Sequence, residues 1–158
     1  DPRVDYLIQG QHCFINEQNE LEWYLANVND SKLERYVNDL IKGMESGLFT
    51  YIAHPEVFVT PFKEWDWFLE KQARKICEAA VKYHIPLEIN LGGLRSTNKL
   101  IVNLRYPCEE FWKIVSEYNV PVYVGVDAHT PEDFENARYD VAEKIIAQNN
   151  LVLLEKIK

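Results

Sequence analysis

The sequence predicts an α/β fold built on a parallel sheet. Segments with the pattern of buried strands alternate along the chain with amphipathic helical segments, giving about four βα units. Residues 121–126 are almost continuously apolar, which is typical of a strand buried on both faces of a parallel sheet. The 158 residues suffice for one domain with a hydrophobic core, and no linker divides them. The pattern leaves open whether the sheet is open or closed into a barrel.

The elements of the first half follow from short apolar runs and helix signals. Residues 4–8 are predicted to form a short strand. A helix begins near Asp30, which offers an N-cap, and ends at Gly47, where a glycine C-cap is expected. Residues 50–53 form the next strand, which stops at His54 because a residue that precedes proline avoids the helical region.

The second half continues the same alternation. Its predicted elements are a helix at 65–83, a strand at 86–91, a helix at 108–118, the strand at 121–126, a last helix and a strand at 151–154. The last helix has a capped start, with Thr130 at the N-cap, Pro131 at the first helical position and Asp133 two residues later.

Charge and composition argue against several classes of function. The chain carries 17 basic and 25 acidic residues, a formal net charge of -8, and no basic stripe that could follow a nucleic-acid backbone. No apolar run approaches the roughly 18–20 residues that span a bilayer, and no signal peptide is recognisable. We therefore expect no nucleic-acid or membrane partner. A small anionic substrate is still compatible with this charge, because a bound metal reverses the local field.

The cysteines and the first residue carry two further expectations. Cys13, Cys77 and Cys108 are an odd number without C-x-x-C spacing, which indicates free thiols in a reducing cytoplasm. The chain starts at Asp1 without a methionine, and patterned sequence follows almost at once. We therefore expect it to be a piece of a longer protein.

Three histidines and an aspartate follow predicted strands. His12 comes after the first strand, His54 ends the second, and Asp127 and His129 follow the strand before the last helix. Because parallel α/β folds bind ligands at the carboxyl ends of their strands, these side chains are expected to lie close together. His84 precedes its strand and so falls at the opposite end, where a structural or surface role is expected.

These residue types point to a metal site. Asp127 and His129 are two residues apart, so in extended backbone their side chains would point to the same face. Carboxylate and imidazole suit Zn²⁺, Mn²⁺ or Fe²⁺, whereas Mg²⁺ and Ca²⁺ prefer oxygen alone. We predict that both residues ligate metal together with His12 and His54. The alternative is a set of core or turn histidines that hydrogen-bond to the backbone.

Polar residues on and after the strand at 86–91 are further candidates. Glu88 and Asn90 alternate with apolar residues and share one face, which could be a barrel interior where Asn90 contacts substrate. The alternative is a hydrogen-bonded structural pair. Arg95 follows a glycine-containing loop just past the strand end, where its guanidinium could bind a phosphate with two hydrogen bonds. A surface arginine is the alternative there.

The tryptophans are most simply explained by packing. Trp65, Trp67 and Trp112 are predicted to lie in the core or on a packed helix face. Trp23 and Tyr24 lie in a polar segment that is predicted to be a loop. They either pack there or line the mouth of a pocket.

Five short motifs resemble, in the same order, those of the PHP (polymerase and histidinol phosphatase) family. The matching segments are VDYLIQGQH (4–12), IAHP (52–55), LEIN (87–90) with GLR (93–95), YP (106–107), and VDAH with PED (126–133). The LEIN and GLR block resembles the histidinol-phosphatase branch more than the polymerase branch. The resemblance covers nearly the whole chain.

The resemblance implies a distorted (β/α)7 TIM-like barrel with up to three Zn, Mn or Fe ions at its mouth. This chain, as a single PHP-like domain over residues 1–158, would be the C-terminal part of that barrel. By resemblance, His12 and His54 correspond to ligands of one metal, Asp127 to a ligand of a second and His129 to a ligand of a third. Arg95 would contact the substrate phosphate.

The sequence also departs from the family pattern. The opening HxH motif and the bridging glutamate have no counterpart, Val126 replaces a serine, and Gly10 and Gln11 replace an SV pair. The chain would therefore carry only part of each metal shell. Whether it is active by itself is left open.

The activity implied by the resemblance is metal-dependent hydrolysis of a small phosphomonoester by a metal-activated hydroxide. The expected substrate is L-histidinol phosphate, in histidine biosynthesis, with Asp127, His129, His12 and His54 acting through the metals. Three alternatives stay open: a PHP-type nucleotide phosphatase or nuclease, a non-catalytic metal-poor relative, and a TIM-like enzyme without metal. The sequence does not predict the native metal or the oligomeric state.

Overall fold

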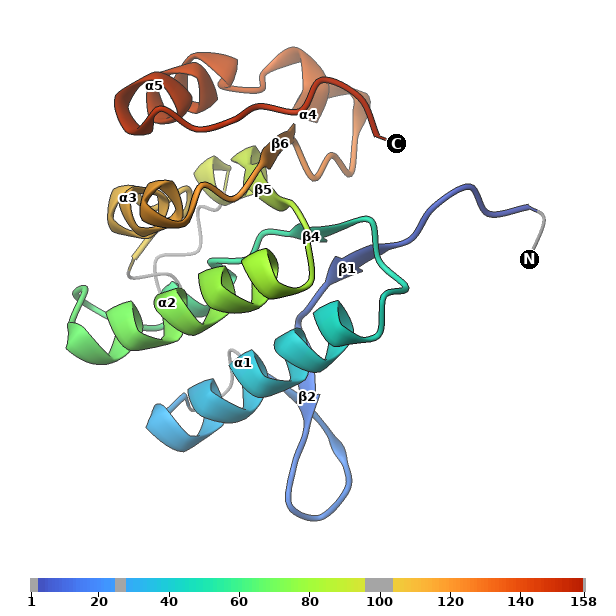
Figure 1. Ribbon diagram of the computed structural model, residues 1–158, viewed down its shortest axis with the longest axis vertical. Coiled ribbons are helices and arrows are strands. Elements are labelled where there is room, and N and C mark those ends of the chain that lie inside the picture. The colour runs from blue at the N-terminus through green and yellow to red at the C-terminus, as the bar shows by residue number, and fades with distance from the viewer. Residues whose placement is uncertain (1–2, 25–27, 96–103, 158) are drawn as a thin grey trace.

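A parallel four-stranded sheet forms the centre of the chain, which a computed structural model describes over residues 3–24, 28–95 and 104–157 (Figure 1). The strands, in their order across the sheet, are β1 (Ile8–Gly10), β4 (Tyr51–Ala53), β5 (Leu87–Asn90) and β6 (Val122–Gly125). Gln9, Ile52, Leu87 and Val122 line up in one row across all four strands. The predicted parallel α/β sheet is confirmed.

Within the described residues this sheet is open. β1 pairs with β4 on one side, and β6 pairs with β5 and with the single residue Leu153 on the other. β1 and β6 therefore stand at the two edges, and closure into a (β/α)7 barrel stays a prediction.

Helices cover the sheet in chain order. α1 (Asp30–Glu45), α2 (Trp67–Lys82) and α3 (Glu109–Tyr118) lie side by side on one side of the strands, and α3 contacts α5 (Tyr139–Asn149) (Figure 1). The N-cap of α1 is Asn29, one residue before the predicted Asp30, and its side chain accepts a hydrogen bond from the Lys32 N–H. Past the end of α1, Gly47 has a φ of 66°, the left-handed conformation expected of a glycine there.

The core lies between these helices and the sheet, and it contains the buried carboxylate of Glu56. Glu56 is 0% exposed and accepts hydrogen bonds from the Cys108 N–H (2.7 Å) and from Trp112 Nε1 (2.6 Å). Burial raises the pKa of Glu56 to about 8. Glu56 thus ties the segment after His54 to the start of α3. The largest fully buried side chains are Trp112, Tyr24, Tyr36, Phe58, Phe111 and Leu33.

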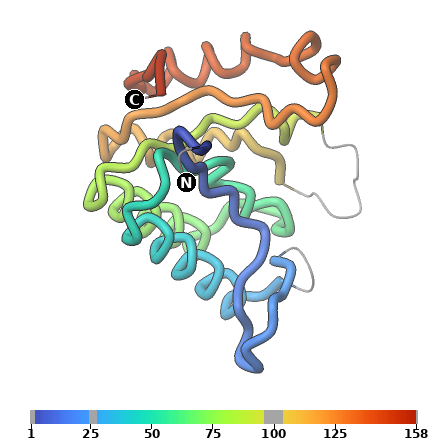
Figure 2. The backbone as a smooth tube through the Cα atoms, turned by 90° about the vertical axis from the view of Figure 1, so that its right-hand side faces the viewer, coloured from blue at the N-terminus to red at the C-terminus, as the bar shows by residue number. Residues whose placement is uncertain are grey.

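The N-terminal segment differs from its prediction in two ways. The first strand is β1 at Ile8–Gly10 and not residues 4–8, because the side chains before Ile8 find little to pack against and are about half exposed. A hairpin of β2 (Cys13–Ile15) and β3 (Leu21–Trp23) replaces the predicted loop and projects from the body (Figure 2). Trp23 is 61% exposed, whereas Tyr24 is buried and donates a hydrogen bond to the Phe58 carbonyl.

The C-terminal segment also differs. The capped start at Thr130 belongs to a short helix, α4 (Pro131–Glu135), which ends before α5 begins, so the predicted last helix is two helices. Residues 151–154 do not form a full strand. Instead, Val122 forms a single bridge with Leu153.

Two tryptophans that were predicted to pack differ in their burial. Trp67 is 71% exposed at the start of α2, so its predicted packing is wrong, whereas Trp112 is fully buried as predicted. Cys13, Cys77 and Cys108 are free thiols, as expected. In residues 3–24, 28–95 and 104–157, no helix is both long and apolar enough to cross a bilayer.

Candidate metal centre at the carboxyl ends of the strands

The structure brings three of the predicted metal ligands to one cavity. His12 lies two residues past β1, His54 directly follows β4, and Asp127 lies two residues past β6. All three line a cavity of about 410 Å³ at the carboxyl ends of the strands, together with Glu88 and Asn90. His129 is exposed beside this cavity, with its Nε2 3.7 Å from Asp127 Oδ1.

His12 and His54 form a pair at the centre of this site. Their ring centroids are 4.7 Å apart. His54 is only 4% exposed, and its Nδ1 has no hydrogen-bond partner among the described residues. Burial, together with the neighbouring His12, lowers the pKa of His54 to about 4, so its imidazole is neutral at pH 7. A neutral imidazole with an unpaired ring nitrogen has the chemistry of a metal ligand.

Glu88, which the sequence placed on the same strand face as Asn90 without a metal or catalytic role, lies in the cavity. Its Oε2 accepts hydrogen bonds from the His54 N–H (3.0 Å) and from Asn90 Nδ2 (2.7 Å). Burial raises the pKa of Glu88. Asn90 Oδ1 also accepts from the Gly92 N–H, so the amide of Asn90 is engaged at both ends, as in the structural-pair alternative.

Gly125 on β6 makes room for Glu88. A Cβ on Gly125 would lie 1.7 Å from Glu88 Oε1. A glycine at this position therefore lets the carboxylate cross from β5 toward the carboxyl end of β4.

Arg95 holds the loop that carries Asp127 through hydrogen bonds to its backbone. Its Nη1 donates to the Val126 carbonyl (2.6 Å), its Nη2 donates to the Asp127 carbonyl (2.5 Å), and its Nε lies 3.1 Å from Asp133 Oδ1. Asp133 in turn accepts a hydrogen bond from the His129 N–H. Arg95 therefore holds the backbone of Val126 and Asp127, two residues that line the cavity, and its contact with phosphate stays a prediction.

The prediction that Asp127 and His129 share a face of extended backbone was wrong. Asp127 has a φ of 51°, so the backbone there is left-handed and not extended, and an i, i+2 alternation does not apply. The two side chains approach each other through the turn and not along a strand.

The described residues provide only part of a metal shell. Across residues 3–24, 28–95 and 104–157, no three or more His, Cys, Asp or Glu side chains are grouped closely enough to hold a metal ion. The candidate ligands form two pairs, His12 with His54 and Asp127 with His129. The unpaired Nδ1 of His54 and the mixture of imidazole and carboxylate donors fit Zn²⁺, Mn²⁺ or Fe²⁺.

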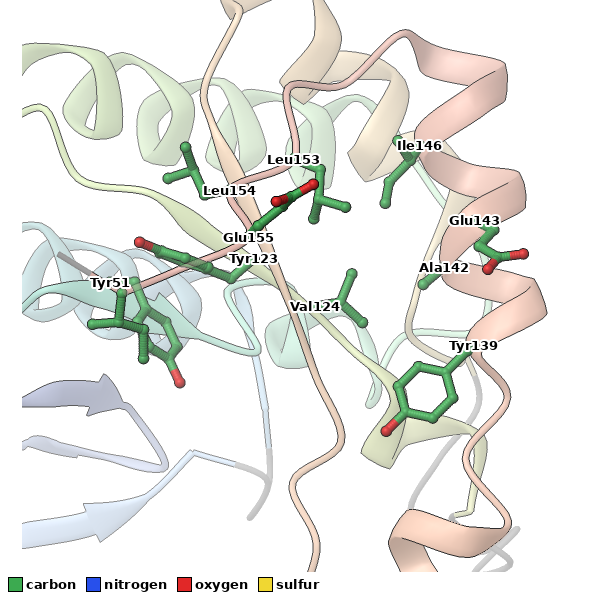
Figure 3. Close-up of a pocket in the computed structure, with 11 residues that line it drawn as sticks. Tyr51, Tyr123, Val124, Tyr139, Ala142, Glu143, Ile146, Leu153, Leu154 and Glu155 are labelled. Atoms are coloured by element: carbon green, nitrogen blue, oxygen red, sulfur yellow. The ribbon is translucent and has the colours of Figure 1, made fainter.

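His84 and a second cavity lie away from the candidate metal centre. His84 is exposed in the turn between α2 and β5, at the end where the sequence placed it. A cavity of about 510 Å³ lies between α5, β6 and the C-terminal segment, where Ala142 and Ile146 face Val124 (Figure 3). No histidine or cysteine lines that cavity, although Tyr51 lines both it and the candidate metal centre.

Comparison with known proteins gives a structural match but no sequence match. No protein-family model matches the chain, and no curated protein sequence matches it. Among solved structures, it is similar to the crystal structure of a candidate histidinol phosphatase, hisK, from Listeria monocytogenes, with a TM-score of 0.60 and 16% sequence identity. The match covers 89% of this chain and 58% of that protein, so the chain spans less than two thirds of its length. Over most of its length, the chain therefore shares the fold of that protein.

Proposed function

We propose that this chain is part of a metal-dependent phosphomonoesterase of the PHP type, acting on L-histidinol phosphate. The observation that carries the proposal is the pair of His12 and His54, with an unpaired buried ring nitrogen, in a cavity that also holds Asp127. The likeness of fold to a candidate histidinol phosphatase supports the reaction class. The substrate rests on the sequence resemblance.

His12, His54, Asp127 and His129 would hold the metals, with further ligands from outside the described residues. When bound, divalent cations supply positive charge for the phosphate and lower the pKa of water. The chain's own residues orient these ligands. Glu88 holds the backbone of His54, and Arg95 holds the backbone of Asp127.

Arg95 would also bind the phosphate. A guanidinium has five N–H donors, of which three are engaged by the 126–133 loop. The other two donors have no partner among the described residues, and we expect them to bind the nonbridging oxygens of a substrate. The same side chain would thus fix the loop and the phosphate relative to each other.

The test is metal content followed by activity, on the full-length protein purified without chelator. We expect about two to three equivalents of Zn, Mn or Fe per chain and release of phosphate from L-histidinol phosphate. Nucleoside monophosphates and short oligonucleotides serve as competing substrates. Faster turnover of either would favour the nucleotide phosphatase or nuclease alternative instead.

One observation favours a second candidate, a non-catalytic metal-poor relative. The part of the chain that the structure describes lacks any group of three or more potential ligands. A metal content near zero in the full-length protein, with no phosphate released, would establish this alternative and exclude the phosphatase.

A further inference from the structure

The hairpin β2–β3 presents an apolar face to the surroundings. Cross-strand pairing places Cys13 opposite Trp23 and Ile15 opposite Leu21, so all four side chains share one face. Phe14 points the other way and is buried in the core. On the outward face, Ile15 is 48%, Trp23 61% and Leu21 71% exposed. Exposed apolar residues gathered in this way mark a binding surface more often than chance.

This apolar face continues into the candidate metal centre. It lines a cavity of about 450 Å³ that also includes Gly10 and His12, and those two residues line the metal-site cavity as well. The Trp23 and His12 ring centroids are 5.8 Å apart, and the next ring along is His54. The rings of His54, His12 and Trp23 therefore form a row from the strand ends to the hairpin.

We propose that Trp23 is a specificity-determining residue that stacks on a flat ring in the alcohol part of the substrate, while the phosphate lies at His54 and Asp127. The inference rests on the proposed function, since it names the class of ester that the same site would take. A cavity of this size suits one ring and a short chain. An indole face that is solvent-exposed and adjoins the site offers such a ring a stacking partner.

The charges of the residues that line the cavity of about 450 Å³ restrict the class of substrate further. None of the described residues that line it is lysine or arginine. Asp39 lies at its far end, with its Oδ1 2.8 Å from Lys42 Nζ. A second anionic group on the substrate would find no basic partner among the lining residues. The preferred class is therefore a monophosphate ester whose alcohol carries a neutral or cationic ring.

The experiment is calorimetric binding of phosphonates to the full-length, metal-loaded protein, which gives a readout independent of turnover. 3-Phenylpropylphosphonate is compared with propylphosphonate, which lacks the ring. We expect the wild type to bind the ring compound about tenfold more tightly. Trp23→Ala should bring the ratio close to one, and Trp23→Phe should keep most of it. Trp67→Ala is the matched control, because Trp67 is 71% exposed on α2, and it should leave the ratio unchanged.

A carboxylated ring, 3-(4-carboxyphenyl)propylphosphonate, tests the charge argument and should bind more weakly than the phenyl compound. The inference is overturned if Trp23→Ala keeps the wild-type ratio, if the wild type shows no preference for the ring, or if the substitution instead dissociates a dimer in sedimentation. Hydrolysis of L-histidinol phosphate, measured on the same wild-type sample, tests the proposed function separately. Ring preference without hydrolysis would refute the phosphatase but not the stacking role of Trp23. Hydrolysis without ring preference would refute the stacking role but not the phosphatase.

Discussion

His54 joins two properties that seldom occur together in a histidine with no ligand. Its side chain is 4% exposed, and its Nδ1 has no hydrogen-bond partner among the described residues. A buried polar group without a partner costs about 1–3 kcal/mol of stability. A bound cation would remove that cost, which makes His54 the residue on which the metal proposal is most directly tested.

His54→Ala in the full-length protein should lower the metal content by about one equivalent and the rate of phosphate release by at least about 100-fold. The reason is that a ligand is lost from the centre of the site. Elemental analysis and a phosphate-release assay give the two values. His84→Ala is the control, since His84 is exposed at the opposite end of the sheet. Unchanged metal content in His54→Ala would remove this residue from the ligand set.

Arg95→Ala should raise KM for phosphate esters about tenfold and lower the free energy of unfolding by about 1–2 kcal/mol. The loss of stability follows from the hydrogen bonds of the guanidinium to the Val126 and Asp127 carbonyls, and the change in KM follows from the proposed contact with phosphate. Arg95→Lys keeps the charge but loses the fork of donors. Steady-state kinetics and urea unfolding measure the two effects. A KM that stays at the wild-type value in both variants would show that Arg95 serves the loop alone.

At the residue scale, the positions of the candidate metal ligands were easier to predict than the residues that hold their backbone. His12, His54 and Asp127 were found because each follows a strand, and strand ends meet at one edge. The role of Arg95 in holding the loop was not predictable, since two of its partners, the Val126 and Asp127 carbonyls, lie about thirty residues further on and belong to the backbone. Backbone carbonyls carry no signal in the sequence.

Among the elements, Gly125 on β6 leaves room for the Glu88 side chain of β5. Gly125→Ala should destabilise the protein by about 1–3 kcal/mol, because the added methyl group would overlap the carboxylate of Glu88. Displacing that carboxylate also removes the hydrogen bond from the His54 N–H. Chemical denaturation measures the loss. In a double-mutant cycle, Glu88→Ala should relieve part of the cost of Gly125→Ala, and strictly additive effects would contradict the overlap.

Helices α2 and α3 are joined by an ion pair on their surface. Arg74 Nη1 lies 2.6 Å from Glu117 Oε2, and this hydrogen bond lowers the pKa of Glu117 below its usual value of 4.5. A lowered pKa in the folded state adds stability above the unfolded pKa, and that stability is lost as the pH falls through the folded value.

Glu117→Gln should therefore be less stable than the wild type near pH 7, and the difference should vanish in acid below about pH 4. Thermal unfolding between pH 3 and pH 7 gives the comparison. Glu64→Gln, at an exposed carboxylate outside this ion pair, is the control. A difference that persists undiminished at pH 3 would assign the effect to helix packing.

At the element scale, the long helices were predictable and the hairpin was not. α1, α2 and α3 each repeat apolar residues at helical spacing over ten or more residues. Each strand of the hairpin has only three residues, which is too short to establish an alternation. The break between α4 and α5 was missed because the cap at Thr130 indicates where a helix starts and not where it ends.

For the whole molecule, metals held by the two candidate pairs would together connect the ends of three strands. His12 follows β1, His54 follows β4 and Asp127 follows β6, so one cluster would bind the sheet together across its width. Barrel closure could not be judged from the sequence, because strand patterns are the same in open and closed sheets.

Chelation of the full-length protein should therefore lower its melting temperature. A ligand at 100 times its Kd stabilises the folded state by about 2.7 kcal/mol, and removal of the metal reverses this gain. Differential scanning calorimetry with and without chelator measures the shift, and readdition of Zn²⁺ or Mn²⁺ should restore it. His54→Ala should show a smaller shift than the wild type. Equal shifts in both proteins would place the stabilising metal elsewhere.

The order of the strands in the sheet has a consequence for how the chain is made. Strands that are neighbours in space are also successive in the sheet-forming part of the sequence, from β1 through β4 and β5 to β6. During synthesis from the N-terminus, each new strand can thus dock on the strand that emerged just before it. The nascent sheet grows at one edge, and each addition closes a loop of one helical crossover without waiting for the C-terminus.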